Sequence, residues 1–396
     1  GLVGWGRVAR CLTTGTTRFA DAESWWKQVS AEADVRNDVN LPGTGLITFG
    51  SFSFSADSLD QSRLVVPEVV IGRREGRSWR TTITADPQHP DETYASAYLD
   101  PAEEPSGDLA TPIEIVAGSV SEQEWPGVIA RAIDRIGAGD VRKVVLARDE
   151  LAKASGPIDL HRVLSRLSQR YAATWTFAVD GLVGATPEML VRLLEGTVHS
   201  RVLAGTVRRS HAAKRLVAED HPDFKPEHHV DPQLKLISSE KDLEEHAYAV
   251  RSVADALGPH CHNLAVPEQP FVLKLPDVYH LASDISGVHT GEATSLRLAA
   301  ALHPSAAVCG TPAAEAAALI ADLERMDRGR YAGPVGWMDV AGEGDWGIAL
   351  RCGELCDDPR RMRLFAGGGI VAASDPEAEL AETEIKLAAM RYALEG

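Results

Sequence analysis

The chain has 396 residues, of which 44% are apolar and 24% are charged, a composition typical of globular proteins with a large core. The formal net charge of −17 argues against a nucleic-acid partner, because no basic stripe offsets the acidic residues. No segment is as long and apolar as a membrane span, so we expect a cytoplasmic protein with no membrane partner.

Residues 1 to about 115 are expected to form short strands separated by turns. The expected strands are Gly45–Phe49, Val65–Ile71 and Trp79–Ile83. An exposed, Pro-rich connection is expected from Asp86 to Pro112. The chain begins at Gly1 rather than at a methionine, so we expect further residues to precede it.

Beyond residue 115, segments of helical and strand period alternate. The expected helices are Glu122–Ile136, Ile158–Leu167, Asp242–Leu257, Pro312–Met326 and Pro376–Leu394. The expected strands are Val141–Arg148 and Thr174–Val179, the second continuing through Gly181–Gly184. The five cysteines lack the Cys-x-x-Cys pairing of zinc and redox sites, so we expect free thiols. The paired histidines His228–His229 and His260–His262 are expected in loops rather than as metal ligands.

Lys143 lies inside the apolar run Val141–Arg148, where strand alternation places it on the same face as Val145 and Ala147. Burial among apolar neighbours disfavours the charged ammonium, so a neutral amine becomes available as a base or nucleophile. The alternative for this run alone is a lysine whose stem covers apolar surface while its head reaches water.

Glu188 follows Pro187 at an expected strand-to-helix turn. A carboxylate there could stabilise the first turn of a helix through the helix dipole. It could equally be a buried general acid, and the local sequence leaves both interpretations open.

Two expected helices each carry two carboxylates spaced three residues apart, which places each pair on one helix face. The pairs are Asp242 with Glu245 and Glu379 with Glu382. Two such helices could together bind one hard divalent cation through oxygen ligands. The alternative is two solvated acidic faces, with Glu382 and Lys386 forming an ordinary i, i+4 ion pair.

Two further segments carry groups that suit an anionic ligand. The run Phe365–Val371 contains three consecutive glycines, so its backbone amides could approach an anion closely. Arg351 ends the apolar run Ile348–Leu350, and a guanidinium group there suits bidentate binding of a carboxylate. A salt bridge inside the fold is the alternative, and this run alone does not decide between them.

The order of these motifs resembles that of the chorismate-utilising enzymes, and within them the isochorismate synthases. The resemblance covers roughly residues 118–392, about two-thirds of the chain. Its ordered signatures are Lys143–Arg148, Gly184–Glu188, Leu203–Thr206, Ser239–Asp242 with Glu245–His246, His280–Leu281, Leu302–Pro304 through Gly310–Pro312, and Arg328–Arg351 with the glycine run and the last helix. Residues 1–115 would be the variable N-terminal half and 116–396 the chorismate-binding catalytic region, together forming one compact unit.

The resemblance implies an α+β fold of two packed antiparallel sheets with surrounding helices, and a site in the cleft between the sheets. It also implies that a nucleophile adds at carbon 2 of chorismate while the hydroxyl at carbon 4 departs. Lys143 would be the general base that activates water, and Glu188 the general acid that protonates the leaving hydroxyl.

The same resemblance implies the remaining ligands of the site. Glu245 and Glu382 would bind Mg²⁺, with Asp242 and Glu379 acting directly or through waters, and the metal would hold the ring carboxylate. The implied substrate contacts are Arg351 and Tyr331 at the enolpyruvyl carboxylate, the backbone amides of Gly367 and Gly368, His280 and Thr311 beside the ring, and also Ala204, Gly205, Thr206 and Lys386.

Two positions separate the relatives in this family. Enzymes that make anthranilate usually carry glutamine where Lys143 stands, and those that make aminodeoxychorismate commonly carry lysine where this chain has Ala204. Lys143 with Ala204 therefore favours water as the nucleophile, and we expect no glutaminase subunit. Cys309 and the Gly-Gly-Gly run depart from the usual family pattern but change no charged group.

A salicylate synthase, which would also eliminate pyruvate, shares Lys143 and Ala204 and is the main alternative. The run Tyr331–Trp337 looks more like the isochorismate type. An anthranilate synthase-like enzyme and a non-catalytic chorismate-binding relative are further alternatives. The expected ligands are chorismate and isochorismate, the expected assembly is a monomer or homodimer, and the expected role is in menaquinone or siderophore biosynthesis.

Overall fold

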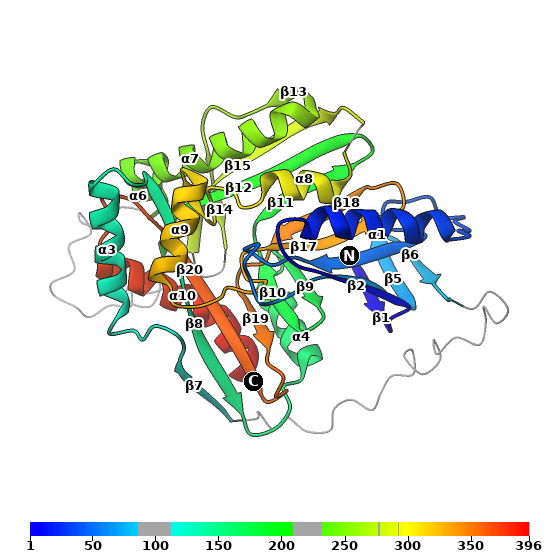
Figure 1. Cartoon of the computed structure of the whole chain (residues 1–396), viewed down its shortest axis with the longest axis horizontal. Coiled ribbons are helices and arrows are strands. Elements are labelled where there is room, and N and C mark those ends of the chain that lie inside the picture. Colours follow the sequence, from blue (N-terminus) through cyan, green and yellow to red (C-terminus); the bar gives the residue numbers. More distant parts are fainter. Residues whose placement is uncertain (86–111, 209–231, 276–277, 292, 396) are drawn as a thin grey trace, which may run out of the picture.

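A computed structural model of the chain describes residues 1–85, 112–208, 232–275, 278–291 and 293–395. Within these residues, all strand pairs are antiparallel, and two large sheets form the framework (Figure 1). The connection expected from Asp86 to Pro112 lies outside the described part of the chain, except for Pro112 itself. The pair His228–His229 also lies outside it.

The first large sheet is the seven-stranded one, which runs in the order β16-β8-β20-β19-β10-β9, with β7 also paired to β8. Its strands are β7 (Ile113–Ala117), β8 (Lys143–Ala154), β9 (Trp175–Val179), β10 (Leu182–Thr186), β16 (Gly310–Thr311), β19 (Cys352–Leu355) and β20 (Arg361–Ile370).

The second is the ten-stranded sheet, in the order β13-β15-β12-β11-β18-β17-β3-β4-β2, with β14 also paired to β15. Its strands are β2 (Ala9–Thr13), β3 (Ile47–Ser51), β4 (Ser62–Val66), β11 (Met189–Leu194), β12 (Thr197–Arg208), β13 (Cys261–Ala265), β14 (Phe271–Lys274), β15 (Val278–His289), β17 (Pro334–Asp339) and β18 (Gly344–Ile348). A small sheet is formed by β1 (Leu2–Trp5), β5 (Val69–Arg74) and β6 (Arg77–Thr82).

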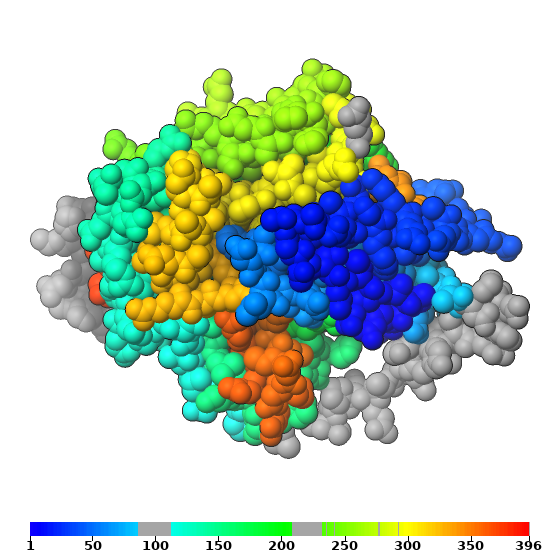
Figure 2. Space-filling model, viewed as in Figure 1, coloured from blue at the N-terminus to red at the C-terminus, as the bar shows by residue number. Residues whose placement is uncertain are grey.

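Helices surround the sheets. They are α1 (Arg18–Glu32), α3 (Trp125–Gly137), α4 (Leu160–Arg170), α6 (Pro232–Ile237), α7 (Glu240–Leu257), α8 (Ser295–Leu302), α9 (Ala313–Leu323) and α10 (Pro376–Glu395), with a 3₁₀ turn at Gly258–His260. Helix α7 packs on β12 and β15, and α10 packs on β20 (Figure 1). The N-terminal residues, blue in Figure 2, lie against the yellow segment around α8, which α1 contacts. No described helix combines the length and apolar character needed to cross a bilayer.

The two large sheets share one hydrophobic core. Leu146 of β8 and Trp346 of β18 belong to the same cluster of buried residues, and both are fully buried. The α+β fold with two packed antiparallel sheets is therefore confirmed, with the small sheet as an addition. Strands β2 to β4 belong to the same sheet as β17, so residues on both sides of position 115 build it. The boundary at residue 115 itself stays a prediction.

The five helices expected from the sequence are all present, with ends shifted by a few residues, and the five cysteines are free thiols. Helix α1 was not expected, because residues 1–115 were interpreted as strands only. The expected strand Val65–Ile71 is wrong: it is divided into β4 and β5 at Pro67, which has no backbone N–H to donate to a sheet. His262 lies in β13 rather than in a loop.

The expected continuous strand from Thr174 to Gly184 is also wrong. Asp180 and Gly181 have φ angles of 46° and 89°, so the chain reverses there and β9 pairs with β10 as a hairpin. Strand β10 then leads directly into β11, which belongs to the other large sheet. The chain crosses between the sheets again from β18 to β19.

Arg330 connects both large sheets through a buried guanidinium group. Nη1 donates to Ser51 Oγ of β3 at 2.7 Å and to the Val179 carbonyl of β9 at 2.9 Å. Nε donates to Glu354 of β19 at 2.9 Å and to Asp60 at 3.3 Å. The side chain is 1% exposed, so these bonds form away from water.

We expect Arg330→Met to lower the free energy of unfolding by about 3–5 kcal/mol, because Glu354 and Asp60 lose their buried cation. Arg360→Met is the matched control, since its ion pair with Asp358 is solvent-exposed and its loss should leave stability nearly unchanged. Urea denaturation measures both values. Equal losses in the two variants would contradict the role of Arg330.

Candidate functional site

A cavity lies between the two large sheets and is bounded on one side by α10. Residues from β10–β11, β12, β15 and the β18–β19 connection form one wall, and β8, β20 and α10 form the other. Of the residues expected at the site, the cavity is lined by Glu188, Ala204, Gly205, Thr206, Glu245, His280, Tyr331, Arg351, Gly367, Gly368, Glu382 and Lys386.

The remaining expected site residues lie behind this lining. Lys143 is fully buried and lies against Gly369, which lines the cavity: a β-carbon at Gly369 would be 3.0 Å from Lys143 Cε. Asp242 packs against Gly205, and Glu379 against Gly368. Thr311 does not line the cavity, because it is held in β16, where it pairs with Lys143.

Lys143 begins β8, and its side chain is enclosed completely. Its Nζ atom lies 3.3 Å from Glu245 Oε1, but it makes no hydrogen bond to a described group. The expectation of purely apolar surroundings is therefore wrong in one respect, because the Glu245 carboxylate lies beside the amine. A buried polar atom left without a hydrogen bond beside a cavity is a feature that a bound ligand or water would satisfy.

Glu188 lies where the chain passes from β10 to β11, between two strands and not at the start of a helix as expected. This excludes the interpretation as a helix-capping carboxylate. Burial raises its pKa to about 8, while a backbone hydrogen bond from Leu203 and the charges of Lys143, Lys386 and Arg351 act in the opposite direction. Glu188 is therefore largely protonated at pH 7 and can donate a proton into the cavity.

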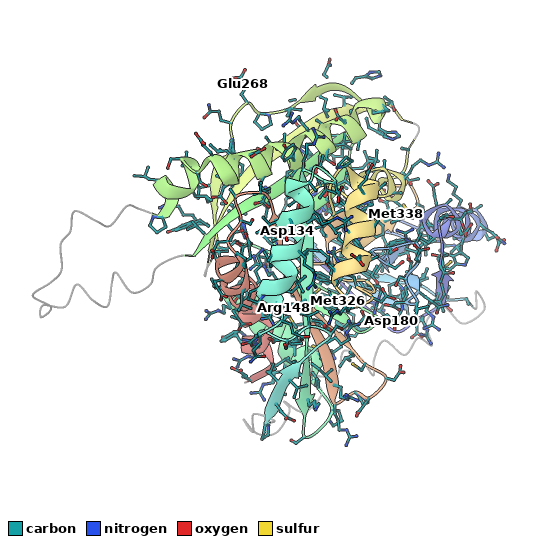
Figure 3. All side chains as sticks on the ribbon, turned by 60° about the vertical axis from the view of Figure 1, so that its left-hand side comes forward. Asp134, Arg148, Asp180, Glu268, Met326 and Met338 are labelled. Atoms are coloured by element: carbon teal, nitrogen blue, oxygen red, sulfur yellow. The ribbon has the colours of Figure 1, made fainter. Side chains whose placement is uncertain are left out.

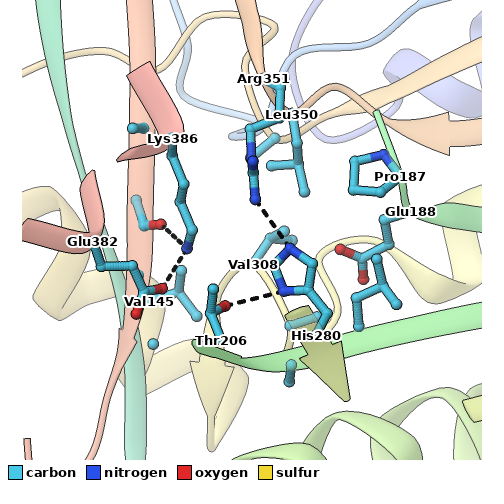
Figure 4. Close-up of a pocket in the computed structure, with 18 of the residues that line it drawn as sticks. Val145, Pro187, Glu188, Thr206, His280, Val308, Leu350, Arg351, Glu382 and Lys386 are labelled. Atoms are coloured by element: carbon cyan, nitrogen blue, oxygen red, sulfur yellow. Dashed lines mark hydrogen bonds and ion pairs between the residues drawn. The ribbon is translucent and has the colours of Figure 1, made fainter. Parts of the chain in front are cut away.

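A chain of hydrogen bonds links Arg351, His280 and Thr206 across the cavity wall (Figure 4). Arg351 Nη2 lies 3.1 Å from His280 Nε2, and Thr206 Oγ1 lies 3.0 Å from His280 Nδ1. Burial first, and then the charges of Arg351 and Lys386, hold the pKa of His280 well below its usual value. The imidazole is thus neutral, accepts from the guanidinium at Nε2 and donates from Nδ1 to the Thr206 hydroxyl.

Helix α10 contributes Glu382 and Lys386, which lie side by side in Figure 4. Lys386 Nζ donates to Glu382 Oε1 at 2.6 Å and to the Gly367 carbonyl of β20 at 2.7 Å. The expected i, i+4 ion pair is therefore present, and it points into the cavity instead of into solvent.

The position of α10 is fixed by Arg148 of β8, which is 2% exposed and is labelled in Figure 3. Its Nε donates to Thr383 Oγ1 at 2.9 Å, and Nη2 pairs with Glu384. Both partners directly follow Glu382 in the chain, so these bonds orient the part of α10 that faces the cavity.

Three of the four carboxylates expected to bind a metal approach the same two glycines. A β-carbon on Gly368 would lie 3.1 Å from Glu379 Oε2 and 3.6 Å from Glu382 Oε1, and one on Gly369 would overlap Glu245 Oε1. Only glycines leave room for these groups. Carboxylate oxygens are the donors that hard divalent cations prefer, so the donor set fits Mg²⁺.

The four carboxylates are nevertheless not gathered as one cluster. In the described part of the chain, only Glu122, Glu150 and Glu384 bring three candidate ligand atoms within 4.8 Å of one another. Two members of that cluster, Glu150 and Glu384, are ion-pair partners of Arg148 and Arg391.

Sequence reasoning gave no role to Arg328 and Phe365, which also line the cavity. Arg328 is 3% exposed and donates to the Val145 carbonyl at 2.7 Å, while Glu324 neutralises its charge. Phe365 stacks on Tyr331 with ring centroids 5.0 Å apart. Arg328 lies in a polar run that gave no sign of burial, whereas Phe365 begins the glycine run and could have been suspected from it.

Comparisons of the sequence and of the structure with known proteins point to the same family. The family described as "Chorismate binding enzyme" matches residues 1–395. The chain is 35% identical to isochorismate synthase DhbC of Bacillus subtilis (strain 168) over 354 residues, which are 85% of this chain and 78% of the relative. It is 33% identical to the salicylate biosynthesis isochorismate synthase of Pseudomonas aeruginosa, and the match covers 98% of this chain and 82% of the relative.

A solved structure of MenF, the menaquinone-specific isochorismate synthase from Escherichia coli, superposes with a TM-score of 0.77. The match covers 99% of this chain and 85% of that one, at 24% sequence identity. At this level of identity, the likeness establishes the fold.

The buried carboxyl group of Glu188 predicts a pH dependence of stability. In the folded chain its pKa is about 8, against 4.5 for an unperturbed glutamate, so the folded state binds this proton more tightly. Its contribution to stability is complete below pH 4.5 and is lost as the pH rises through 8. Relative to Glu188→Gln, which does not titrate, the wild type should lose up to about 5 kcal/mol over this window.

Urea denaturation of both proteins at several pH values measures this difference. Glu268→Gln is the control, because Glu268 is exposed and its substitution should leave the pH profile unchanged. A constant difference between wild type and Glu188→Gln from pH 4.5 to 8 would show that Glu188 is ionised in the folded chain.

Proposed function

Because the chain belongs to the family of chorismate binding enzymes, we propose that it is an isochorismate synthase, which converts chorismate to isochorismate. The observation that carries this proposal is the pairing of two buried groups at one cavity. Lys143 is a buried amine without a hydrogen bond, and Glu188 is a carboxyl group that keeps its proton near pH 7. A base and an acid with separate environments suit a reaction that adds water at one carbon and removes a hydroxyl at another.

In the proposed reaction, Lys143 in its neutral form takes a proton from water, and the water oxygen bonds to carbon 2 of chorismate. The two ring double bonds shift, the bond between carbon 4 and its hydroxyl oxygen breaks, and Glu188 donates its proton to that oxygen. One water enters and one water leaves, so the reaction is an isomerisation.

Cationic side chains at the cavity suit the carboxylates of a dianionic substrate. Arg351 and Lys386 line the cavity, where Glu245 and Glu382 are anionic and the neutral Glu188 adds no charge. Arg351, whose guanidinium is oriented by His280, would bind the enolpyruvyl carboxylate with the Tyr331 hydroxyl. Burial raises the pKa of Tyr331, so its phenol remains a hydrogen-bond donor.

We propose Mg²⁺ as the cofactor, held by Glu245 and Glu382, with Asp242 and Glu379 as direct or water-mediated ligands. When bound, the ion would supply positive charge to the ring carboxylate of the substrate. The backbone of Gly367 and Gly368 would contact the ligand closely, since neither residue has a side chain to block it. We further propose that the product serves menaquinone or siderophore biosynthesis.

Product analysis tests the function directly. Purified protein with chorismate and Mg²⁺ should form isochorismate without pyruvate, as followed by chromatography and a coupled pyruvate assay. Pyruvate released in step with the product would favour a salicylate synthase instead. If no product forms with or without ammonium, the protein is a non-catalytic relative that only binds chorismate.

Lys143→Ala should lower kcat by roughly 10² to 10⁴ while chorismate binding stays nearly intact, because only proton transfer from water is lost. Steady-state kinetics and calorimetric titration measure the two effects. Lys153→Ala, on the same strand but partly exposed, is the control and should behave as wild type. Undiminished turnover in Lys143→Ala would refute the assignment of the base.

Glu382→Gln should raise the Mg²⁺ concentration that gives half-maximal activity, because one anionic oxygen ligand becomes a neutral amide. Glu377→Gln, at the exposed start of the same helix, is the control. Initial rates over a series of Mg²⁺ concentrations measure the effect. Identical titration curves for the two variants would count against Glu382 as a ligand.

A further inference from the structure

His246 is a buried residue without a role in the proposed reaction. It is 3% exposed and follows Glu245 in α7. Its Nδ1 atom lies 3.2 Å from the Ala204 carbonyl oxygen of β12, and Nε2 lies 2.8 Å from Ser283 Oγ of β15. Because a carbonyl oxygen can only accept, Nδ1 is the donor to Ala204. The imidazole thus ties α7 to two neighbouring strands.

The hydrogen-bonded carbonyl belongs to an irregular part of β12. Ala204 pairs with Leu281 and Thr206 with His280, so Gly205 is an extra residue without a partner in β15. Its φ angle is +81°, in the left-handed region that favours glycine. This is a β-bulge, a feature that redirects the side chains of a strand. The bulge presents Ala204, Gly205 and Thr206 to the cavity.

Helix α7 rests directly on the bulge. A β-carbon at Gly205 would come within 3.0 Å of Asp242 Cβ, so backbone and helix are in close contact there. One turn further along α7, Glu245 reaches to 3.3 Å from Lys143 Nζ on the opposite sheet. A shift of α7 relative to β12 would therefore move Glu245 away from Lys143 and disturb the wall that carries Thr206.

We propose that His246 is a positioning residue, whose hydrogen bond to the Ala204 carbonyl holds α7 on the bulge. Through this bond it sets Glu245 against Lys143 and fixes the Ala204–Thr206 wall of the cavity. The proposal rests on the proposed function, in which these groups face the substrate. The bond to Ser283 orients the imidazole ring, and the bond to the Ala204 carbonyl holds α7 in place on the bulge.

Two substitutions separate the two bonds. His246→Asn keeps an N–H donor near the position of Nδ1, and His246→Gln keeps one near the position of Nε2. His246→Gln should lower kcat about 10- to 100-fold with a smaller change in KM, because reacting groups are displaced while ligand contacts remain. His246→Asn should stay within about threefold of wild type. Ser283→Ala, which removes the other bond, is the matched control and should resemble His246→Asn.

Hydrogen exchange without substrate or metal gives an independent readout. In His246→Gln, the backbone amides of residues 203–206 should exchange faster than in wild type, while those in His246→Asn and Ser283→Ala should not. Equal kinetics and equal exchange for the two His246 variants would overturn the proposal. Global unfolding of either variant, seen by circular dichroism, would also overturn it, because the bond would then support the whole fold.

The two proposals fail in different ways. If wild type does not form isochorismate, the proposed function is wrong, but the exchange pattern still reports whether His246 holds the bulge. If wild type is active and His246→Gln matches it in kcat and in exchange, only the role of His246 is wrong.

Discussion

Holding ionisable groups away from water between two sheets is the constraint on which the site depends. An isolated charge in such a place is costly, so each group needs a partner or must be neutral. Glu188 satisfies this by keeping its proton, and His280 by remaining an uncharged imidazole. Lys143 lies beside Glu245, and Lys386 beside Glu382. The chemistry that we propose uses two of these groups, Lys143 and Glu188.

The path of the chain explains how these groups meet. The chain passes between the two large sheets at Pro187–Glu188 and again at Ala349–Arg351, and each crossing leaves one functional side chain at the cavity. Arg351 has a φ angle of +49°, an uncommon conformation for a residue other than glycine. Strand β20 adds three glycines at the point where carboxylates from α7 and α10 approach its backbone. Glycines at these positions are therefore required both for close packing of the helices on β20 and for the approach of the carboxylates to the cavity.

The arrangement also reconciles an acidic protein with an anionic ligand. The formal net charge of −17 describes the whole chain, whereas Arg351 and Lys386 line the cavity and Lys143 lies directly behind its wall. Low exposure strengthens their local effect, because water screens them less than it screens the surface carboxylates. The sign of the potential at a site is thus set by a few side chains and by their burial.

The sequence by itself determined five helices beyond residue 115 and the two carboxylate pairs on helix faces. These features follow from local periodicity, which needs no knowledge of distant residues. Only the tertiary structure decided that Glu188 lies between two strands, that Lys143 faces Glu245, that Thr311 stays behind the wall and that His246 reaches Ala204. Each of these depends on contacts between segments far apart in the chain, and local periodicity carries no information about which segments meet.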